Sequence, residues 1–133
     1  MNGNENQVAT DSVDAAVRIH STLGPGLLES VYERVLAYEL RKRAHRVDTQ
    51  VAVPITYDGH QIDEAFRADL LVDDCVLVEL KSIENLAPVH KKQLLTYMKL
   101  AHKRLGLLLN FGAPRMKDGI VRLVNGLPDT QSP

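Results

Sequence analysis

The stretch FRADLLVDDCVLVELK, residues 66–81, decides the fold of this 133-residue chain. Apolar residues dominate it, yet it contains acids at Asp69 and Glu79 and a base at Lys81. A charged group placed in an apolar segment costs free energy unless a partner compensates it. Because Asp73-Asp74 is typical of a tight turn, we expect the segments on either side of it to pair as neighbouring antiparallel strands.

The rest of the chain predicts helices before and after this hairpin. Apolar residues recur at helical spacing over residues 11–23 and 27–44, and Gly24-Pro25-Gly26 separates the two segments. A third helix is expected from Pro88 to about residue 101 or 103. The expected strands are 51–57, 61–72, 75–80 and 104–111, with 120–124 as a peripheral one. This order predicts an α/β fold, with helices flanking a mixed central sheet.

Length and composition limit the classes of function that this protein can have. We expect one domain over residues 11–126, between a disordered N-terminal tail (1–10) and a loose C-terminal tail (127–133). The 16 Lys+Arg against 17 Asp+Glu give a net charge of −1, which argues against a non-specific nucleic-acid coat protein but permits an enzyme acting on nucleic acid. A single cysteine, no secretory core and no apolar stretch of membrane-spanning length lead us to expect a soluble, cytoplasmic protein.

The acids and the base of the central hairpin are expected to converge. Alternate strand residues share a face, so Glu79 and Lys81 point the same way, and the turn brings Asp69 beside Glu79. Clustered carboxylates repel, and a divalent cation relieves the repulsion. Oxygen ligands without paired Cys or His suit Mg²⁺ or Mn²⁺, which would support phosphodiester hydrolysis with Lys81 stabilising charge at phosphorus. The alternative is an isolated acid and a surface Glu–Lys pair, worth ~0–1 kcal/mol.

Polar side chains on the helices are further candidates. Gln93 and Tyr97 are four residues apart on one helix face, where they would bind phosphate or Lys81; otherwise they are a surface glutamine and a core aromatic. Glu29 lies in the first turn of its helix, so the helix dipole is a sufficient explanation, and a third metal carboxylate is the more specific one. Asn110 is expected to cap the turn after its strand.

The histidines carry less information. None of the five stands at a metal-ligand spacing from another, and we expect them mostly at the surface, with His90 near phosphate.

Several of these motifs occur together in one known family. Gly26, Glu29 and Tyr32 match the signature of the GxxExxY protein family, and LGPGLLESVYE, RAD, VELK and LNFG follow the family in order and spacing. The resemblance covers residues 13–124. That family is placed in the PD-(D/E)xK nuclease superfamily, so the resemblance implies a restriction-endonuclease-like αβββαβ core.

The resemblance also implies roles for the hairpin residues. Asp69 matches the first metal-binding acid, although Ala68 replaces the usual preceding proline. Glu79 matches the second acid and Lys81 the catalytic lysine. The main-chain carbonyl of Leu80 would complete the metal shell.

The helical residues receive roles in the same way. Glu29 is similar to the helical metal-binding glutamate of one branch of the superfamily, and Gln93 with Tyr97 resembles that branch's QxxxY motif. Tyr32, one turn after Glu29, is counted with them as a candidate substrate or phosphate contact.

Two functions from different classes follow. The first is a Mg²⁺-dependent (or Mn²⁺-dependent) nuclease, with DNA rather than RNA as the expected substrate. The alternative is a non-catalytic module that keeps the nuclease fold and binds nucleic acid or protein. A small domain covers few base pairs, so a homodimer or a partner subunit would extend either contact.

Overall fold

A five-stranded mixed sheet forms the centre of the protein in the computed structural model, which describes residues 4–127. The strand order is β1-β2-β3-β4-β5, antiparallel except for the parallel pair β3–β4, whose crossover contains α3. The strands are β1 Val47–Tyr57, β2 His60–Val72, β3 Val76–Lys81, β4 Leu105–Asn110 and β5 Ile120–Val124. The predicted α/β class and the αβββαβ order are therefore confirmed, with an additional short 3₁₀ helix, η1 (Met116–Gly119).

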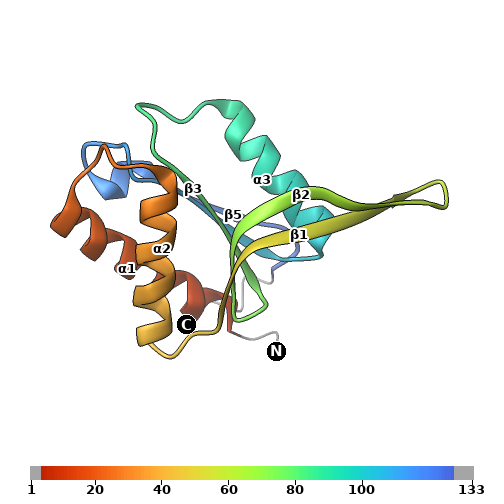
Figure 1. Ribbon diagram of the computed structural model, residues 1–133, viewed down its shortest axis with the longest axis horizontal. Helices are drawn as coiled ribbons and strands as arrows, with labels where there is room; N and C mark the ends of the chain where they lie inside the picture. The colour runs from red at the N-terminus through yellow and green to blue at the C-terminus, as the bar shows by residue number, and fades with distance from the viewer. Residues whose placement is uncertain (1–3, 128–133) are drawn as a thin grey trace.

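Helices cover both faces of the sheet (Figure 1). α1 (Glu5–Leu23) and α2 (Glu29–Lys42) lie against one face, and α3 (Pro88–Ala101) lies against the other. Each face has its own apolar cluster. Alternating strand residues supply both clusters, as expected for a sheet buried on two sides.

The first helix begins earlier than predicted. α1 starts at Glu5, so a disordered tail over 1–10 is wrong for residues 5–10; residues 1–3 lie outside the described part. Val8 and Ala9 extend the apolar stripe of the helix into the core, and the buried Glu5 carboxylate pairs with Arg104 at 3.1 Å. At the other end, most of the predicted tail, 128–133, also lies outside the described residues.

The β1–β2 ribbon is longer than the sheet that supports it. β2 pairs with β3 only over residues 70–72. Beyond them the ribbon first packs against α3, and its tip then projects from the body (Figure 1). The ribbon also exchanges its faces part-way along. Leu70 and Val72 belong to the cluster under α1 and α2, whereas the even-numbered Phe66 and Ala68 belong to the cluster under α3. Since alternate residues of a regular strand share one face, the exchange places an irregularity at residue 69.

None of the helices in the described range is both long and apolar enough to cross a membrane.

Candidate active site

Asp69 and Glu79 meet where β2 and β3 separate. The last Cα-paired residues are Leu70 and Val78, and beyond them the two acids bind each other's strand. The main-chain N–H of Asp69 donates to Glu79 Oε2 at 3.0 Å, and the N–H of Leu80 donates to Asp69 Oδ2 at 2.9 Å. The structure thus places the two acids side by side, as the hairpin spacing predicted, and fixes the orientation of both carboxylates.

The surroundings of the pair disfavour the ionisation of both acids at once. Burial, followed by the nearby Asp69 carboxylate, raises the pKa of Glu79 to about 8. The hydrogen bond from the Asp69 main-chain N–H and the positive charge of Lys81 offset only part of that rise. Burial and the same two acids also raise the pKa of Tyr97. A divalent cation beside the pair would favour the ionised form of Glu79.

Lys81 ends β3 and is half-buried, on the same strand face as Glu79. Its carbonyl accepts the Phe111 N–H at 2.8 Å, which ties it to the end of β4. Asn110 holds the segment after Lys81 against the segment after β4, because its Oδ1 accepts the N–H groups of Ile83 at 3.1 Å and Gly112 at 3.0 Å. The expected cap at Asn110 is therefore present, and it supports the segment that carries the lysine.

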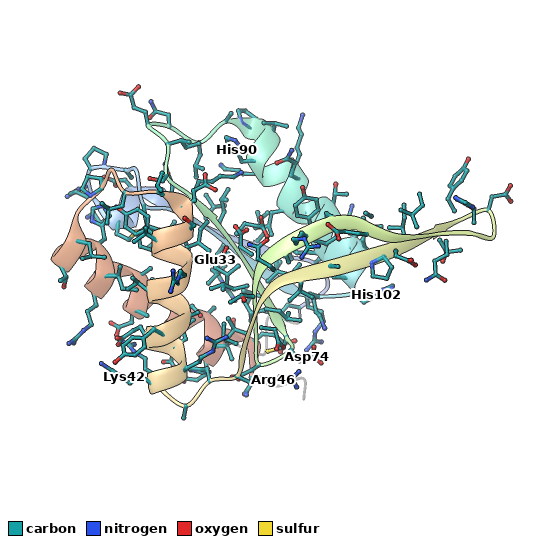
Figure 2. All side chains as sticks on the ribbon, in the orientation of Figure 1. Glu33, Lys42, Arg46, Asp74, His90 and His102 are labelled. Atoms are coloured by element: carbon teal, nitrogen blue, oxygen red, sulfur yellow. The ribbon has the colours of Figure 1, made fainter. Side chains whose placement is uncertain are left out.

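A third carboxylate, Glu33 of α2, joins the acids through Gln50 of β1. The Gln50 amide donates to Glu33 Oε1 at 2.7 Å and to Asp69 Oδ1 at 3.3 Å. Burial raises the pKa of Glu33, and the charges of Asp69 and Glu29 add to the rise, although the Gln50 hydrogen bond lowers it. Figure 2 shows Glu33 on the side of α2 toward the strands.

Sequence reasoning missed Glu33 and selected Glu29 instead. Glu29 is exposed in the first turn of α2, one turn before Glu33, so the two share a helix face. This spacing of four residues was the feature of the sequence that could have indicated Glu33. Glu33 is the member of the pair that enters the network around Asp69.

Tyr32 has a structural position that differs from the predicted one. Its side chain is fully buried and stacks on Phe111, with ring centroids 4.4 Å apart. Its hydroxyl donates to the Gly24 carbonyl and accepts the Leu27 N–H at 3.2 Å. A side chain enclosed in this way cannot contact phosphate, so the expected substrate contact of Tyr32 is corrected to a clamp on the turn between α1 and α2.

Tyr97 and Gln93 lie on α3, on the other side of the sheet. Tyr97 is half-buried and stacks on Phe66 of β2, with centroids 3.9 Å apart and an interplanar angle of 6°. Gln93, one turn earlier, is exposed. Burial, followed by the charges of Glu79 and Asp69, raises the pKa of Tyr97, which is consistent with a position of this side chain near the acids.

His60 and His102 are exposed, as expected for most of the histidines, whereas the other three are partly or fully buried. His20 is buried, with Nε2 2.8 Å from a main-chain carbonyl of the loop after β4. His45 bridges two acids, with Nδ1 2.6 Å from Asp73 and Nε2 2.8 Å from Asp11. Burial alone would lower the pKa of His45, but these two contacts outweigh it and raise that pKa. His90, labelled in Figure 2, accepts the Ala87 N–H at 2.9 Å and caps α3.

The donor set of the site fits a hard divalent cation. Asp69 and Glu79 supply carboxylate oxygens, and the main-chain carbonyl of Leu80 follows directly in the chain. Within residues 4–127, no three His, Cys, Asp or Glu side chains are grouped closely enough to hold an ion by themselves. The fit therefore rests on the two paired acids, which a cation would stabilise in their ionised form.

Comparison with known proteins agrees with this geometry. No curated protein and no solved structure matches the chain significantly. A family model described as the PD-(D/E)XK nuclease superfamily matches residues 6–123, which include both acids and the lysine. A match over this much of its length shows that the chain belongs to the PD-(D/E)XK nuclease superfamily.

Proposed function

We propose that this protein is a metal-dependent nuclease that hydrolyses phosphodiester bonds in DNA. The observation that carries the proposal is the reciprocal pair of Asp69 and Glu79 beside Lys81, in a setting that raises the pKa of Glu79 to about 8. Two acids that repel each other in a partly buried site are the arrangement a divalent cation stabilises. Superfamily membership supports the same conclusion.

The metal would be held by Asp69, Glu79 and the Leu80 carbonyl. Mg²⁺ or Mn²⁺, when bound there, supplies a Lewis acid for the phosphate and lowers the pKa of a coordinated water. The Lys81 ammonium stabilises negative charge on the phosphate oxygens. Of the two helical acids, the hydrogen-bond network favours Glu33 over Glu29 as the third carboxylate of the site.

The face of α3 toward the acids would hold the substrate backbone. The exposed Gln93 amide and the Tyr97 hydroxyl, one turn apart, both suit hydrogen bonds to phosphate oxygens. We further propose membership of the GxxExxY family and action in the cytoplasm, on the motifs and the single cysteine described above. A homodimer or a partner subunit would extend the contact with DNA.

A second function is favoured by one observation. The projecting β1–β2 ribbon carries Asp58, Asp63 and Glu64, and the chain as a whole has a net charge of −1. Such a surface is unfavourable for long contacts with DNA and suits a module that binds protein or short nucleic-acid segments without cleaving them.

The test is a cleavage assay with single- and double-stranded DNA and RNA, with Mg²⁺, Mn²⁺ or EDTA. We expect metal-dependent cleavage of DNA, and a loss of about 10²-fold or more in Lys81→Ala. Lys92→Ala is the matched control, because Lys92 is an exposed lysine on α3. If Lys81→Ala cuts as fast as the parent, the site assignment is wrong. Binding with no cleavage under either metal would establish the second function.

A further inference from the structure

We propose that Gln50 is a positioning residue of the site. Its backbone is held in an unfavourable conformation so that its amide lies between Glu33 and Asp69. This inference deepens the proposed function and rests on it in one respect, because it takes Asp69 as a metal ligand.

The backbone of Gln50 is an outlier within its strand. Its φ of +52° lies in the left-handed region, which a non-glycine residue in a strand adopts only at a cost in free energy. The neighbouring pairs, Thr49 with Leu70 and Val51 with Ala68, keep the same register, so no residue is inserted. The outlier is therefore a single residue opposite Asp69.

This conformation explains the exchange of faces along the ribbon. Val47 packs in the cluster under α1 and α2, whereas Val51 and Val53 pack with the cluster under α3. Odd-numbered residues of β1 thus change sides across Gln50, as even-numbered residues of β2 do across Asp69. The reversal lets the outer ribbon pack on α3 while its inner part packs under α2.

Gln50 makes hydrogen bonds with residues of α2 and β2. Its amide donates to Glu33 Oε1 at 2.7 Å and to Asp69 Oδ1 at 3.3 Å. Its carbonyl accepts from Arg67 Nη1 at 3.3 Å, and Arg67 is itself paired with Glu64 at 2.6 Å. Both ends of Gln50 are therefore fixed from neighbouring elements.

The amide controls the orientation of Asp69. Oδ2 of Asp69 accepts the Leu80 N–H, and Oδ1 accepts Gln50, so both oxygens of this carboxylate have a fixed partner. A neutral donor between Asp69 and Glu33 also lets two like charges approach each other. Loss of such an outer partner of a metal ligand typically weakens metal affinity about 10–100-fold.

The experiment compares Gln50→Met and Gln50→Gly with the parent, by calorimetric titration of the full chain with Mn²⁺ and by thermal unfolding without metal. Both variants lack the amide, so we expect Mn²⁺ affinity to fall about tenfold or more in each. Only glycine relieves the positive φ, so Gln50→Gly should melt at a higher temperature than Gln50→Met. Gln61→Met is the matched control, because Gln61 is an exposed glutamine of the same ribbon and should leave both measurements unchanged.

The outcomes separate this inference from the function it rests on. Parent-like Mn²⁺ affinity in both Gln50 variants overturns the positioning role alone. A Gln50→Gly protein that melts below Gln50→Met overturns the backbone part of the inference. A parent that binds no Mn²⁺ overturns the proposed metal site, and the positioning role with it.

Discussion

Asn110 offers a sharp test of how the end of β3 is held in place. It is only 2% exposed, and its Oδ1 accepts the N–H groups of Ile83 and Gly112. Asn110→Leu keeps a similar volume and leaves both donors without a partner. Each unsatisfied buried donor costs about 1–3 kcal/mol. Because Ile83 and Gly112 are themselves half-buried and water can partly replace the lost acceptor, we expect a total loss of about 2–4 kcal/mol.

The measurement is urea unfolding at pH 7, supported by thermal unfolding. For 133 residues the expected loss lowers the melting temperature by about 7–14 °C. Asn85→Leu, at an exposed position in the loop before α3, is the control and should change stability by less than about 0.5 kcal/mol. A loss below about 1 kcal/mol in Asn110→Leu, with an unchanged denaturant slope, would refute the stabilising role of the two Asn110 hydrogen bonds.

Three further predictions concern other parts of the molecule. Tyr32→Phe removes the hydroxyl that holds the turn at residues 24–27 and should cost about 1–2 kcal/mol in thermal unfolding; an unchanged melting temperature would contradict the clamp. The pKa of His45 is raised above 6.5, so its stabilising contribution is complete below pH 6.5 and is lost as pH rises through the folded pKa. The difference in unfolding free energy between the parent and His45→Gln should therefore shrink between pH 6 and 9, and a constant difference would disprove the linkage. The raised pKa of Glu79 means that its charge destabilises the metal-free fold, so Glu79→Gln should be the more stable protein at pH 8 without metal; a lower melting temperature would reverse that conclusion.

Most elements were predictable because their apolar periodicity is strong. The turn at Asp73-Asp74 and the buried strand after it set the antiparallel β2–β3 pair, and the helix between two buried strands set the parallel β3–β4 pair. The start of α1 was not predictable in the same way. Polar composition at the N-terminus conceals Val8 and Ala9, and the partner of Glu5 is 99 residues away.

The candidate site was predictable only within one hairpin. Spacing within the hairpin placed Asp69 beside Glu79, because both lie on strands joined by one turn. Glu33 and Gln50 reach the site from a helix and from a different strand, and no local pattern connects them. The predicted substrate contact of Tyr32 was wrong because spacing alone does not show which way a side chain points. A helical tyrosine beside a glycine turn has the same spacing whether it faces the core or the solvent.

The acids of this site also complete the sheet. Beyond Leu70 and Val78, the next two donors at the strand junction, the N–H groups of Asp69 and Leu80, are satisfied by carboxylate oxygens instead of carbonyls. Side chains therefore replace the backbone ladder where the ribbon turns away toward α3. A backbone donor left unpaired at this partly buried junction would cost free energy, so either acid can turn toward a cation only while it keeps, or exchanges, its strand contact. If a metal binds there as proposed, its binding would be coupled to strand separation at this point, and we expect the ribbon that carries Asp69 to shift when Mn²⁺ is added, with changed amide hydrogen exchange at Asp69 and Leu80 as the measurement.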